Sequence, residues 1–465
     1  MKKDTIKFLK LERVDATKIG LSARTNQFVE IYQNLPIEQA QDQSERCLDC
    51  GNPYCQWKCP VHNYIPVWLK LAMENRIEEA AELSHLTNSL PEICGRVCPQ
   101  DRLCESACTL NDDFGAVTIG NVEKHITDTA FANGWTFSYP EIANDAKKVA
   151  IIGSGPAGLS CADVLTRNGI KAVVFERSEF IGGLLTYGIP AFKLEKSLIK
   201  KRHQILVDAG VEFKLNCEVG KDISLAELNA EYSAVFIAIG TYKPVIESSI
   251  SVDGVSVLQA LDYLSSVNQD ILNGTSVQMA EQIKDKRVLV LGGGDTSMDC
   301  IRTSLRLGAA SVIGAYRRSA GDMPGSKKEY INATEEGANF EFNAQPIGVI
   351  YNDNLVIGVK FIKTSLVIQD DGHRVIQHVA GSEFIIDADI VITAFGFQPE
   401  AQTWLNDYKI TRDNYGRIQL ANNSTQQVMN NIYSGGDIVR GASLVVYAVA
   451  DGMKVAQEIA DKLSQ

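Results

Sequence analysis

The spacing of apolar residues changes once along the chain. Before about Asn144, apolar residues recur three and four positions apart with charged residues between them, as in 67–73 and 77–83, which predicts amphipathic helices. From Lys147 onward, short continuous apolar runs end in glycine, a pattern typical of buried strands in parallel sheets. The polar segment 268–282 has no strong period, and we expect a surface loop there. The sequence therefore predicts a helical N-terminal part followed by an α/β part.

A glycine-rich turn joins a strand to a helix early in the α/β part. The strand covers 147–152, the turn is Gly153-Ser154-Gly155-Pro156-Ala157-Gly158, the helix covers 159–168 and a second strand covers 172–176. In such a unit the glycines let backbone N–H groups approach a pyrophosphate at the helix N-terminus. Glu176, which ends the second strand, can accept hydrogen bonds from ribose hydroxyls. The pattern predicts a dinucleotide site, and a glycine turn in an unrelated α/β domain is the alternative.

A second unit of this kind follows about 140 residues later. No acid follows its second strand, which ends near Tyr316; Arg317 and Arg318 stand there instead. An acid would repel the 2′-phosphate of NADPH, whereas arginine binds it through charge-assisted hydrogen bonds. The unit predicts an NADPH site, and surface arginines without a ligand are the alternative. The residues of this site are Gly292, Gly294, Asp295, Thr296, Ser297, Arg317 and Arg318.

The C-terminal region resembles the Gly-Asp motif of the flavin disulfide-reductase superfamily. The residues that carry the resemblance are 432–438, which include Gly436 and Asp437, and 444–452. In that superfamily the aspartate binds the ribitol of FAD, and the positive end of the next helix faces the flavin. The resemblance implies FAD in the first unit, held by Asp437 and by the backbone at Leu444 and Val445. A turn with a capping aspartate is the alternative.

Cysteine is concentrated in one block, since eight of the 11 cysteines lie between Cys47 and Cys108. Two Cys-Pro steps, at Cys59 and Cys98, each follow a three-residue gap and resemble the ferredoxin run, in which short spacings bring thiolates to an iron–sulfur cluster. Eight cysteines suffice for two four-iron clusters. Four-thiolate zinc sites use similar spacings and are the alternative, but zinc cannot carry single electrons away from a flavin.

Composition and charge narrow the function classes. The 465 residues carry 45 Lys and Arg against 57 Asp and Glu, a net charge of −12, which argues against a protein that follows a nucleic-acid backbone. Without a run of about 18 apolar residues, we expect no membrane-spanning helix. The N-terminus lacks the apolar stretch of a signal peptide. We therefore expect a cytoplasmic protein.

Over nearly its whole length, the chain resembles the small (β) subunits of bacterial NADPH-dependent glutamate synthases. A related arrangement occurs in the N-terminal part of dihydropyrimidine dehydrogenase. The segments that carry the resemblance are 46–66, 94–105, 115–121, 181–190, 316–318 and 323–326. The resemblance implies an α/β fold with an all-helical iron–sulfur domain and two Rossmann-like domains of the flavin disulfide-reductase type. The implied boundaries are 1–145 for the iron–sulfur domain, 146–255 and 396–465 for the FAD-binding domain, and 256–395 for the NADPH-binding domain inserted into it.

The resemblance also implies an activity and a partner. The chain would oxidise NADPH at FAD, without a catalytic side chain, and pass electrons through two [4Fe-4S] clusters to a large (α) subunit that carries FMN. That subunit makes glutamate from glutamine and 2-oxoglutarate. Two alternatives stay open. One is the NAD(P)H-oxidising subunit of a dihydropyrimidine dehydrogenase or ferredoxin-linked oxidoreductase, and the other is a metal-stabilised binding module with vestigial nucleotide sites.

Individual site residues are implied by the same resemblance. One cluster would be held by Cys47, Cys50, Cys55 and Cys108, and the second by Cys59, Cys98, Cys104 and Glu123. Cys94 would then be spare; in the alternative, Cys94 completes the second cluster. The flavin would be lined by Gly183, Leu184, Gly188, Ile189 and Lys193, and Gly240 and Gly396 would mark crossings between the nucleotide domains.

Overall fold

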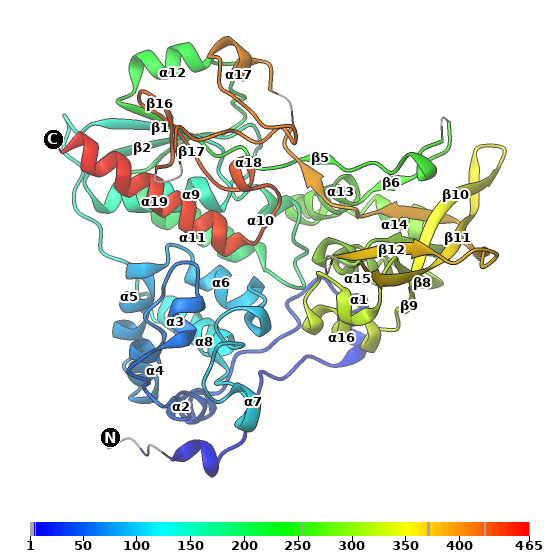
Figure 1. The fold of residues 1–465 in the computed structure, drawn as a ribbon. Coiled ribbons are helices and arrows are strands. Elements are labelled where there is room, and N and C mark those ends of the chain that lie inside the picture. Colours follow the sequence, from blue (N-terminus) through cyan, green and yellow to red (C-terminus); the bar gives the residue numbers. More distant parts are fainter. Residues whose placement is uncertain are drawn as a thin grey trace.

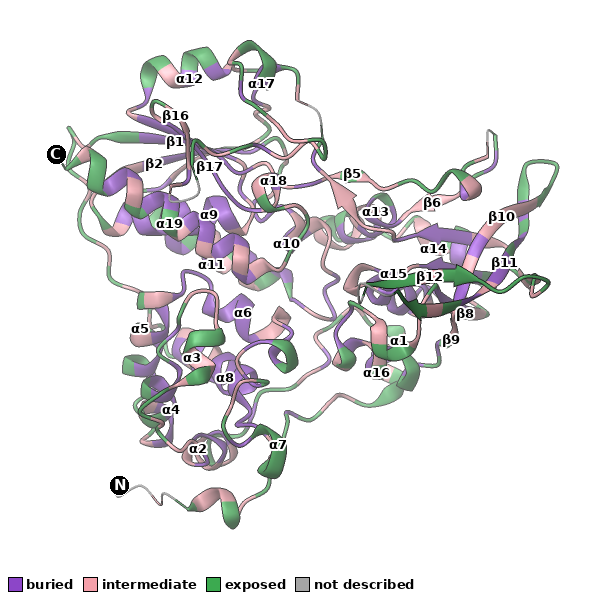
Figure 2. Cartoon of the chain, viewed as in Figure 1, coloured by how far each residue is buried: buried purple, intermediate pink, exposed green. Residues whose placement is uncertain are grey.

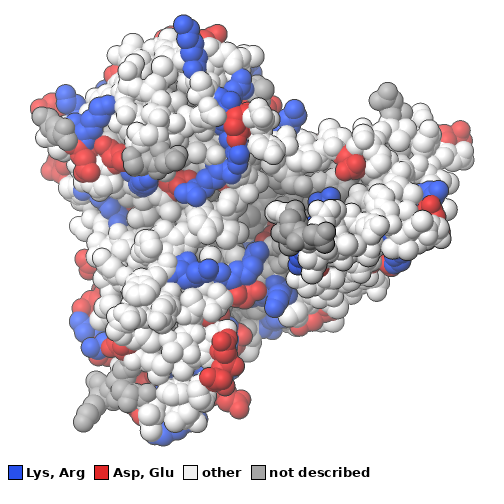
Figure 3. All heavy atoms as spheres, in the orientation of Figure 1, with Lys and Arg blue, Asp and Glu red and all other residues white. Residues whose placement is uncertain are grey.

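The computed structural model describes residues 4, 6–252, 254–369, 373–400, 402–422 and 425–464. Figure 1 shows a helical part, a first sheet unit that carries the C-terminus, and a second sheet unit beside them. Buried residues gather inside each of the three (Figure 2). Within the described residues, no helix has both the length and the apolar character needed to cross a membrane. On the face drawn in Figure 3, basic and acidic side chains are interspersed.

The helical part confirms the amphipathic pattern. Its core packs Trp68, Leu69, Val122 and Ile126, which come from the apolar faces of α4 and α8. Proline stands in the first turn of α4 and of α6, where its missing N–H costs nothing. The elements are η1 (Lys7–Leu9), α2 (Ile37–Glu45), α3 (Tyr54–Lys58), α4 (Ile65–Met73), α5 (Ile77–Thr87), α6 (Pro91–Val97), η2 (Gln100–Arg102), α7 (Asn111–Phe114) and α8 (Ile119–Ala132).

The first sheet unit is built on a six-stranded sheet of order β16-β17-β4-β1-β2-β3, parallel except for β16. Helices α9 and α19 pack against each other beside it. The elements are β1 (Lys148–Ile152), α9 (Pro156–Arg167), β2 (Lys171–Phe175), α10 (Leu184–Tyr187), α11 (Lys196–Asp208), β3 (Glu212–Lys214), α12 (Leu225–Glu231), β4 (Ala234–Ile237), α17 (Trp404–Asp407), β16 (Gln427–Met429), β17 (Ile432–Ser434), α18 (Asp437–Arg440) and α19 (Val445–Leu463).

The second sheet unit has a parallel sheet of order β6-β14-β7-β8-β9 and a separate antiparallel sheet of β10 to β13. The parallel sheet and its helices are η3 (Ser248–Ile250), β6 (Leu258–Gln259), α13 (Ala260–Asn273), α14 (Met279–Ile283), β7 (Arg287–Leu291), α15 (Asp295–Arg306), β8 (Ser311–Tyr316), η4 (Ala320–Asp322), α16 (Lys327–Glu335), β9 (Asn339–Phe342) and β14 (Ile390–Thr393). The antiparallel strands are β10 (Ala344–Asn352), β11 (Leu355–Ile368), β12 (Arg374–His378) and β13 (Phe384–Asp387).

The second unit is inserted into the first. The chain leaves after β4, crosses as β5 (Lys243–Pro244), returns as β15 (Phe397–Gln398), and then adds β17 beside β4. The two crossing strands pair antiparallel, so both connections lie side by side. The inserted arrangement expected from the resemblance is therefore present.

The expected surface loop over 268–282 is wrong. Helix α13 continues to Asn273 and ends at Gly274, which has φ +67°, and α14 follows. Asn268 is buried and donates its side-chain N–H to the carbonyl of Tyr187 at 2.9 Å. Ile271 packs on the core of the second unit. Residues of this stretch make tertiary contacts, and the spacing of apolar residues alone does not reveal such contacts.

The segment before α2 leaves the helical part and reaches the second unit (Figure 1). We call residues 6–36 the N-terminal strap. Its helix α1 (Leu21–Asn26) packs on α15, and Phe28 enters the hydrophobic core of the second unit. The strap therefore links the helical part to a unit encoded some 300 residues later.

Candidate functional site

One large pocket lies where all three parts meet, with a cavity of about 290 Å³. The first unit supplies most of the wall, the second supplies Asp295, Thr296 and Asp299, and the helical part supplies Cys98. Besides Cys98, seventeen of the residues predicted to bind the flavin or a nucleotide line it. They are Gly153, Gly155, Pro156, Ala157, Glu176, Gly183, Leu184, Gly188, Ile189, Lys193, Gly240, Asp295, Thr296, Gly436, Asp437, Leu444 and Val445.

The first glycine turn has the geometry that a dinucleotide needs. Gly153 has φ +101°, and a Cβ there would lie 2.5 Å from the carbonyl oxygen of Ala238. A Cβ on Gly155 would meet nothing within 4 Å, so the backbone is open to the pocket just before α9 begins. Gly158 does not line the pocket; its Cβ would clash with the carbonyl oxygen of Gly153 at 1.9 Å. Gly158, in the first turn of α9, therefore allows the helix to pack closely against the backbone of Gly153.

Glu176 lies at the pocket wall and secures the turn. Its Oε2 accepts hydrogen bonds from the backbone N–H of Ser154 at 2.9 Å and from the Ser154 hydroxyl at 2.6 Å. Its Oε1 accepts from the N–H of Ser178 at 2.8 Å. A carboxylate has acceptor sites beyond these three, so it can also accept from a ribose. The predicted position is thus compatible with its predicted role.

The Gly-Asp motif places a carboxyl group and a helix end at the pocket. Asp437 follows β17, and burial raises its pKa to about 7. Gly436 has φ +76° and donates its N–H to Asp451 at 2.9 Å. The 19-residue helix α19 begins at Val445, and its positive N-terminal end lies at the pocket wall. These groups fit the ribitol and the electron-rich edge of a flavin.

The second glycine turn reaches the same pocket from α15. Gly292 has φ +144°, and a Cβ there would lie 2.4 Å from the carbonyl oxygen of Ala394. Gly294 is open, with nothing within 4 Å of its Cβ position. Asp295 and Thr296 line the pocket, whereas Gly292, Gly294 and Ser297 lie outside its wall. The first glycine turn and the start of α15, which follows the second turn, therefore line one shared pocket.

Arg317 and Arg318 lie after β8, away from the pocket wall. Arg317 is exposed. The Arg318 guanidinium stands 5.6 Å from the ring centre of Tyr316, and among the described residues its buried Nε has no hydrogen-bond partner. A buried guanidinium donor without a partner is available to an anion. The end of β8 is where a 2′-phosphate would be expected.

The first predicted cysteine set gathers around one small cavity. Cys47, Cys50, Cys55 and Cys108 all line it, together with Pro53 and Tyr54. Burial, with smaller contributions from the other thiols of the set, raises the pKa of Cys55 to about 12. Four thiol groups around one small cavity fit a cationic cluster that would stabilise the thiolates.

The second predicted set lies deeper. Cys59, Cys98, Cys104 and Glu123 interact electrostatically with one another. Burial raises the pKa of Glu123 to about 8, and its Oε1 accepts from the Asn63 side chain at 3.0 Å. Cys94, which is buried, interacts with Cys98 and points its Sγ at Asn88 Oδ1, 3.8 Å away. Both candidates for the fourth ligand are therefore beside the set.

Cys98 joins the two kinds of site. With Val97 and Pro99 it lines the large pocket, and it also belongs to the second cysteine set. Cys104 interacts with Cys59 of its own set and with Cys55 of the first. The thiols thus form a continuous series from the pocket to the first set. Within the described residues, no group of three or more His, Cys, Asp or Glu side chains is arranged to bind a single metal ion.

Several pocket residues escaped prediction. Arg177 and Tyr242 line it and stack, with the guanidinium 4.5 Å from the ring centre. Lys196 is buried and donates from Nζ to the carbonyls of Leu185 and Ile189, which holds that part of the wall. Gly396 is not at the pocket; its carbonyl accepts from the N–H of Val245 at the crossing. No sequence pattern indicated the stacking of Arg177 on Tyr242 or the hydrogen bonds of Lys196.

Two family models match the chain. Residues 24–135 match dihydropyrimidine dehydrogenase domain II, 4Fe-4S cluster, and residues 147–452 match pyridine nucleotide-disulphide oxidoreductase. Among solved structures, Mycobacterium tuberculosis FprA in complex with NADPH has a TM-score of 0.57 at 18% identity, covering 69% of this chain and 85% of that one. This likeness confirms the fold of the two sheet units.

Curated relatives match nearly the whole chain. The glutamate synthase [NADPH] small chain of Escherichia coli is 53% identical over 99% of both chains. A putative oxidoreductase of the same organism is 49% identical over 98% of this chain and 71% of its own length. At such identity and coverage the resemblance noted in the sequence is confirmed, and the chain belongs to the family of glutamate synthase [NADPH] small chains.

Proposed function

We propose that this chain is the electron-input subunit of a glutamate synthase. NADPH is oxidised at FAD, and electrons pass through iron–sulfur clusters to a large subunit that forms glutamate. The observation that carries this proposal is Cys98, which borders both the nucleotide pocket and the second cysteine set. We assign one cofactor type to each of three domains: residues 1–145 hold the clusters, 146–255 and 396–465 hold FAD, and 256–395 hold NADPH.

The chain's own residues bind and orient the cofactors. FAD, when bound, supplies the chemistry that accepts a hydride and releases single electrons. Gly155 and the start of α9 leave backbone N–H groups free for its pyrophosphate, and Glu176 and Asp437 hold hydroxyl groups. The N-terminal end of α19 favours negative charge at the pocket. No side chain is needed as an acid or base for hydride transfer.

NADPH binding falls to the second unit. The turn at Gly292 and Gly294 faces the pyrophosphate, and Arg317 and Arg318 bind the 2′-phosphate. The unpartnered Nε of Arg318 supports this preference over NADH. Because Asp295 and Thr296 line the flavin pocket, a nucleotide on this turn reaches the flavin without a second cavity.

Two [4Fe-4S] clusters fit the two cysteine sets. We assign Cys47, Cys50, Cys55 and Cys108 to one cluster, and Cys59, Cys98, Cys104 and Glu123 to the other, with Cys94 spare. Iron analysis of Cys94→Ala and Glu123→Ala tests the assignment. We expect Cys94→Ala to keep full iron content and Glu123→Ala to lose part of it; the reverse result would assign Cys94 as the ligand.

Electrons leave through the first set, which lies farther along the series of thiols from the pocket. Tyr54 lines its cavity and, like Trp57, is more than half exposed. We propose that the large subunit, which carries FMN, takes electrons here, and that the complex works in the cytoplasm without contacting nucleic acid or membrane. The partner follows from the small-chain names of the relatives.

Anaerobic spectroscopy and a reconstituted assay test the proposal. NADPH should bleach the bound flavin and then reduce the clusters. Adding the large subunit should give NADPH oxidation that depends on both glutamine and 2-oxoglutarate. Flavin bleaching without this turnover would favour the second candidate, an oxidoreductase with another acceptor, which the 49% identical putative oxidoreductase supports. No bleaching at all would leave only a metal-stabilised binding module.

A further inference from the structure

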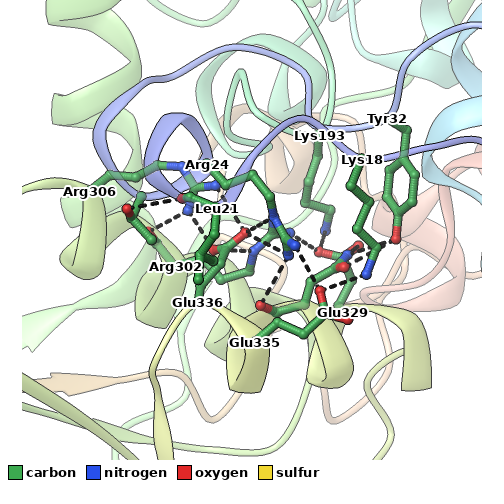
Figure 4. A network of polar contacts seen from close by, with 12 residues as sticks. Lys18, Leu21, Arg24, Tyr32, Lys193, Arg302, Arg306, Glu329, Glu335 and Glu336 are labelled. Carbon is green, nitrogen blue, oxygen red and sulfur yellow. Dashed lines mark hydrogen bonds and ion pairs between the residues drawn. The ribbon is translucent and has the colours of Figure 1, made fainter.

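A buried ion network joins the N-terminal strap to the second unit (Figure 4). Arg24 of α1 contacts Glu335 Oε2 at 2.7 Å and Glu336 Oε1 at 3.3 Å. The Arg24 side chain is 6% exposed and that of Glu336 is fully buried. Lys18, also in the strap, contacts the same Glu335 oxygen at 2.7 Å. Because these side chains are buried, the ion pair can form only when the strap is packed against the second unit.

The network continues inward through α15. Glu336 also binds Arg302 at 2.8 Å and Arg306 at 2.7 Å, and Arg302 binds Glu329 at 2.5 Å. Both arginine side chains are fully buried. Buried charges of this kind are stabilised only in a fixed mutual geometry. Arg24 therefore sets the position of α15, the helix that begins at the second glycine turn.

The other end of the network comes from the first unit and lies at the pocket. Lys193 Nζ contacts Asp299 Oδ1 on α15 at 2.8 Å and Glu329 Oε2 at 3.9 Å. Lys193 and Asp299 both line the flavin pocket. A continuous series of charges thus runs from the strap, through α16 and α15, to the wall where the two nucleotides meet.

Aromatic packing reinforces the junction at Phe192 of the first unit. The guanidinium groups of Arg302 and Arg306 lie 4.5 and 3.9 Å from its ring centre. Phe28 of the strap contacts the same ring, with centroids 6.3 Å apart. The Phe192 carbonyl accepts from the N–H of Ile31 at 3.2 Å. Strap, first unit and second unit therefore meet around one side chain.

Covalently, the second unit is joined to the first by two adjacent strands, and side-chain contacts such as Lys193–Asp299 and Asn268–Tyr187 add to this connection. The covalent crossings β5 and β15 pair only with each other, through four residues, and such a connection is suited to act as a hinge. Hydride transfer needs reacting atoms about 3–3.5 Å apart, and a misplacement of about 1 Å can cost roughly 100-fold in rate. The shared pocket therefore requires a further restraint on α15.

We propose that Arg24 and Lys193 are positioning residues that fix the second unit in the orientation for hydride transfer. The strap holds α15 and α16 from outside, and Lys193 holds α15 at the pocket. This inference rests on the proposed oxidation of NADPH at FAD. It adds that the second unit keeps one fixed orientation relative to the first unit during turnover.

Single-turnover reduction of the flavin by NADPH tests this role. For Arg24→Met in the full chain with FAD and clusters, we expect the limiting rate of bleaching to fall about 10- to 100-fold. The Kd for NADPH should change less than about threefold, because the binding turn is intact. Arg24→Lys should recover part of the rate. Arg76→Ala, which removes a half-exposed arginine of the helical part, is the matched control and should be unchanged.

Lys193→Met adds an independent check. If both residues hold α15, the two substitutions together should slow bleaching less than the product of their separate effects, because they share one function. If Arg24→Met does not fold, Glu335→Gln serves instead, since this 43% exposed carboxylate contacts Arg24 and Lys18; we then expect slowing of about threefold. Folded variants that bleach at the parent rate would overturn the proposal. Failure of the unaltered protein to bleach would instead contradict the proposed function.

Discussion

Arg202 Nη2 of α11 lies 2.8 Å from Glu92 Oε2 of α6, and Arg202 Nε lies 2.9 Å from the other carboxylate oxygen. The two side chains are buried between the helical part and the first sheet unit. Helix α6 contains Cys94 and is followed at once by Cys98. This bidentate pair therefore fixes the cysteine that borders the pocket against the unit that forms most of that pocket.

Removing Glu92 should be strongly destabilising. In Glu92→Ala the Arg202 charge stays buried without its partner, and loss of one member of a buried pair costs about 3–5 kcal/mol. Denaturant unfolding of the anaerobic protein measures the effect. Glu79→Ala, which removes an exposed partner of Arg76, should leave the midpoint unchanged. A midpoint for Glu92→Ala equal to that of the parent would show that the pair contributes nothing.

His85 should make this contact sensitive to acid. Burial lowers its pKa well below 6.5, and the Arg202 charge lowers it further. The ring contacts the Ala81 carbonyl at 2.7 Å through Nδ1 and Arg202 Nη2 at 3.1 Å through Nε2, so the folded protein holds it neutral. The unfolded chain binds a proton below about pH 6.5. The free energy of unfolding is therefore highest above that pH. Below it, protonation of His85 in the unfolded chain lowers the free energy of unfolding by at most about 1.4 kcal/mol per pH unit.

Unfolding free energies at pH 7.5 and 5.5 check this expectation. His85→Gln keeps an acceptor for Arg202 but cannot bind a proton in this range, so its stability should fall less between the two pH values. The same pH dependence in both proteins would mean that other groups cause the acid sensitivity.

Gly452 should be essential for FAD binding although it lies outside the pocket wall. A Cβ at this position of α19 would lie 2.0 Å from the carbonyl oxygen of Ala157, at the start of α9. In Gly452→Ala the first glycine turn must shift, and we expect protein purified with most of its FAD lost. Gly348→Ala, whose added Cβ meets nothing within 4 Å, should keep full flavin content. Flavin content is read from the absorption spectrum.

The sequence signals behind the predicted sites are local. The strand, glycine turn and helix around Gly155 occupy adjacent positions, and so do the first cysteines. Long-range contacts have no such signal. The loop expected over 268–282 is helical because Asn268 and Ile271 are used in tertiary contacts, and Arg24 lies in a polar stretch whose partners are more than 300 residues away. Sequence pattern gave no indication of either.

Arg318 should decide between the two nicotinamide nucleotides. Removing a charged hydrogen-bond donor costs about 1.5–3 kcal/mol, so Arg318→Ala should weaken NADPH binding about tenfold or more. NADH lacks the 2′-phosphate, and its affinity should be nearly unchanged. Titration of both nucleotides against flavin bleaching gives the ratio. An equal loss for both would place the arginine at a shared part of the nucleotide.

The strap has a consequence for biosynthesis. The partner of Arg24, Glu336, is synthesised 312 residues after it. At about 5–20 residues per second, that delay is roughly 15 to 60 seconds. During this interval Arg24 has neither Glu335 nor Glu336 to pair with, while the cysteine region is already available for cluster insertion. A translation product that ends before α16 lacks Glu335 and Glu336, so its strap cannot form these ion pairs with the second unit.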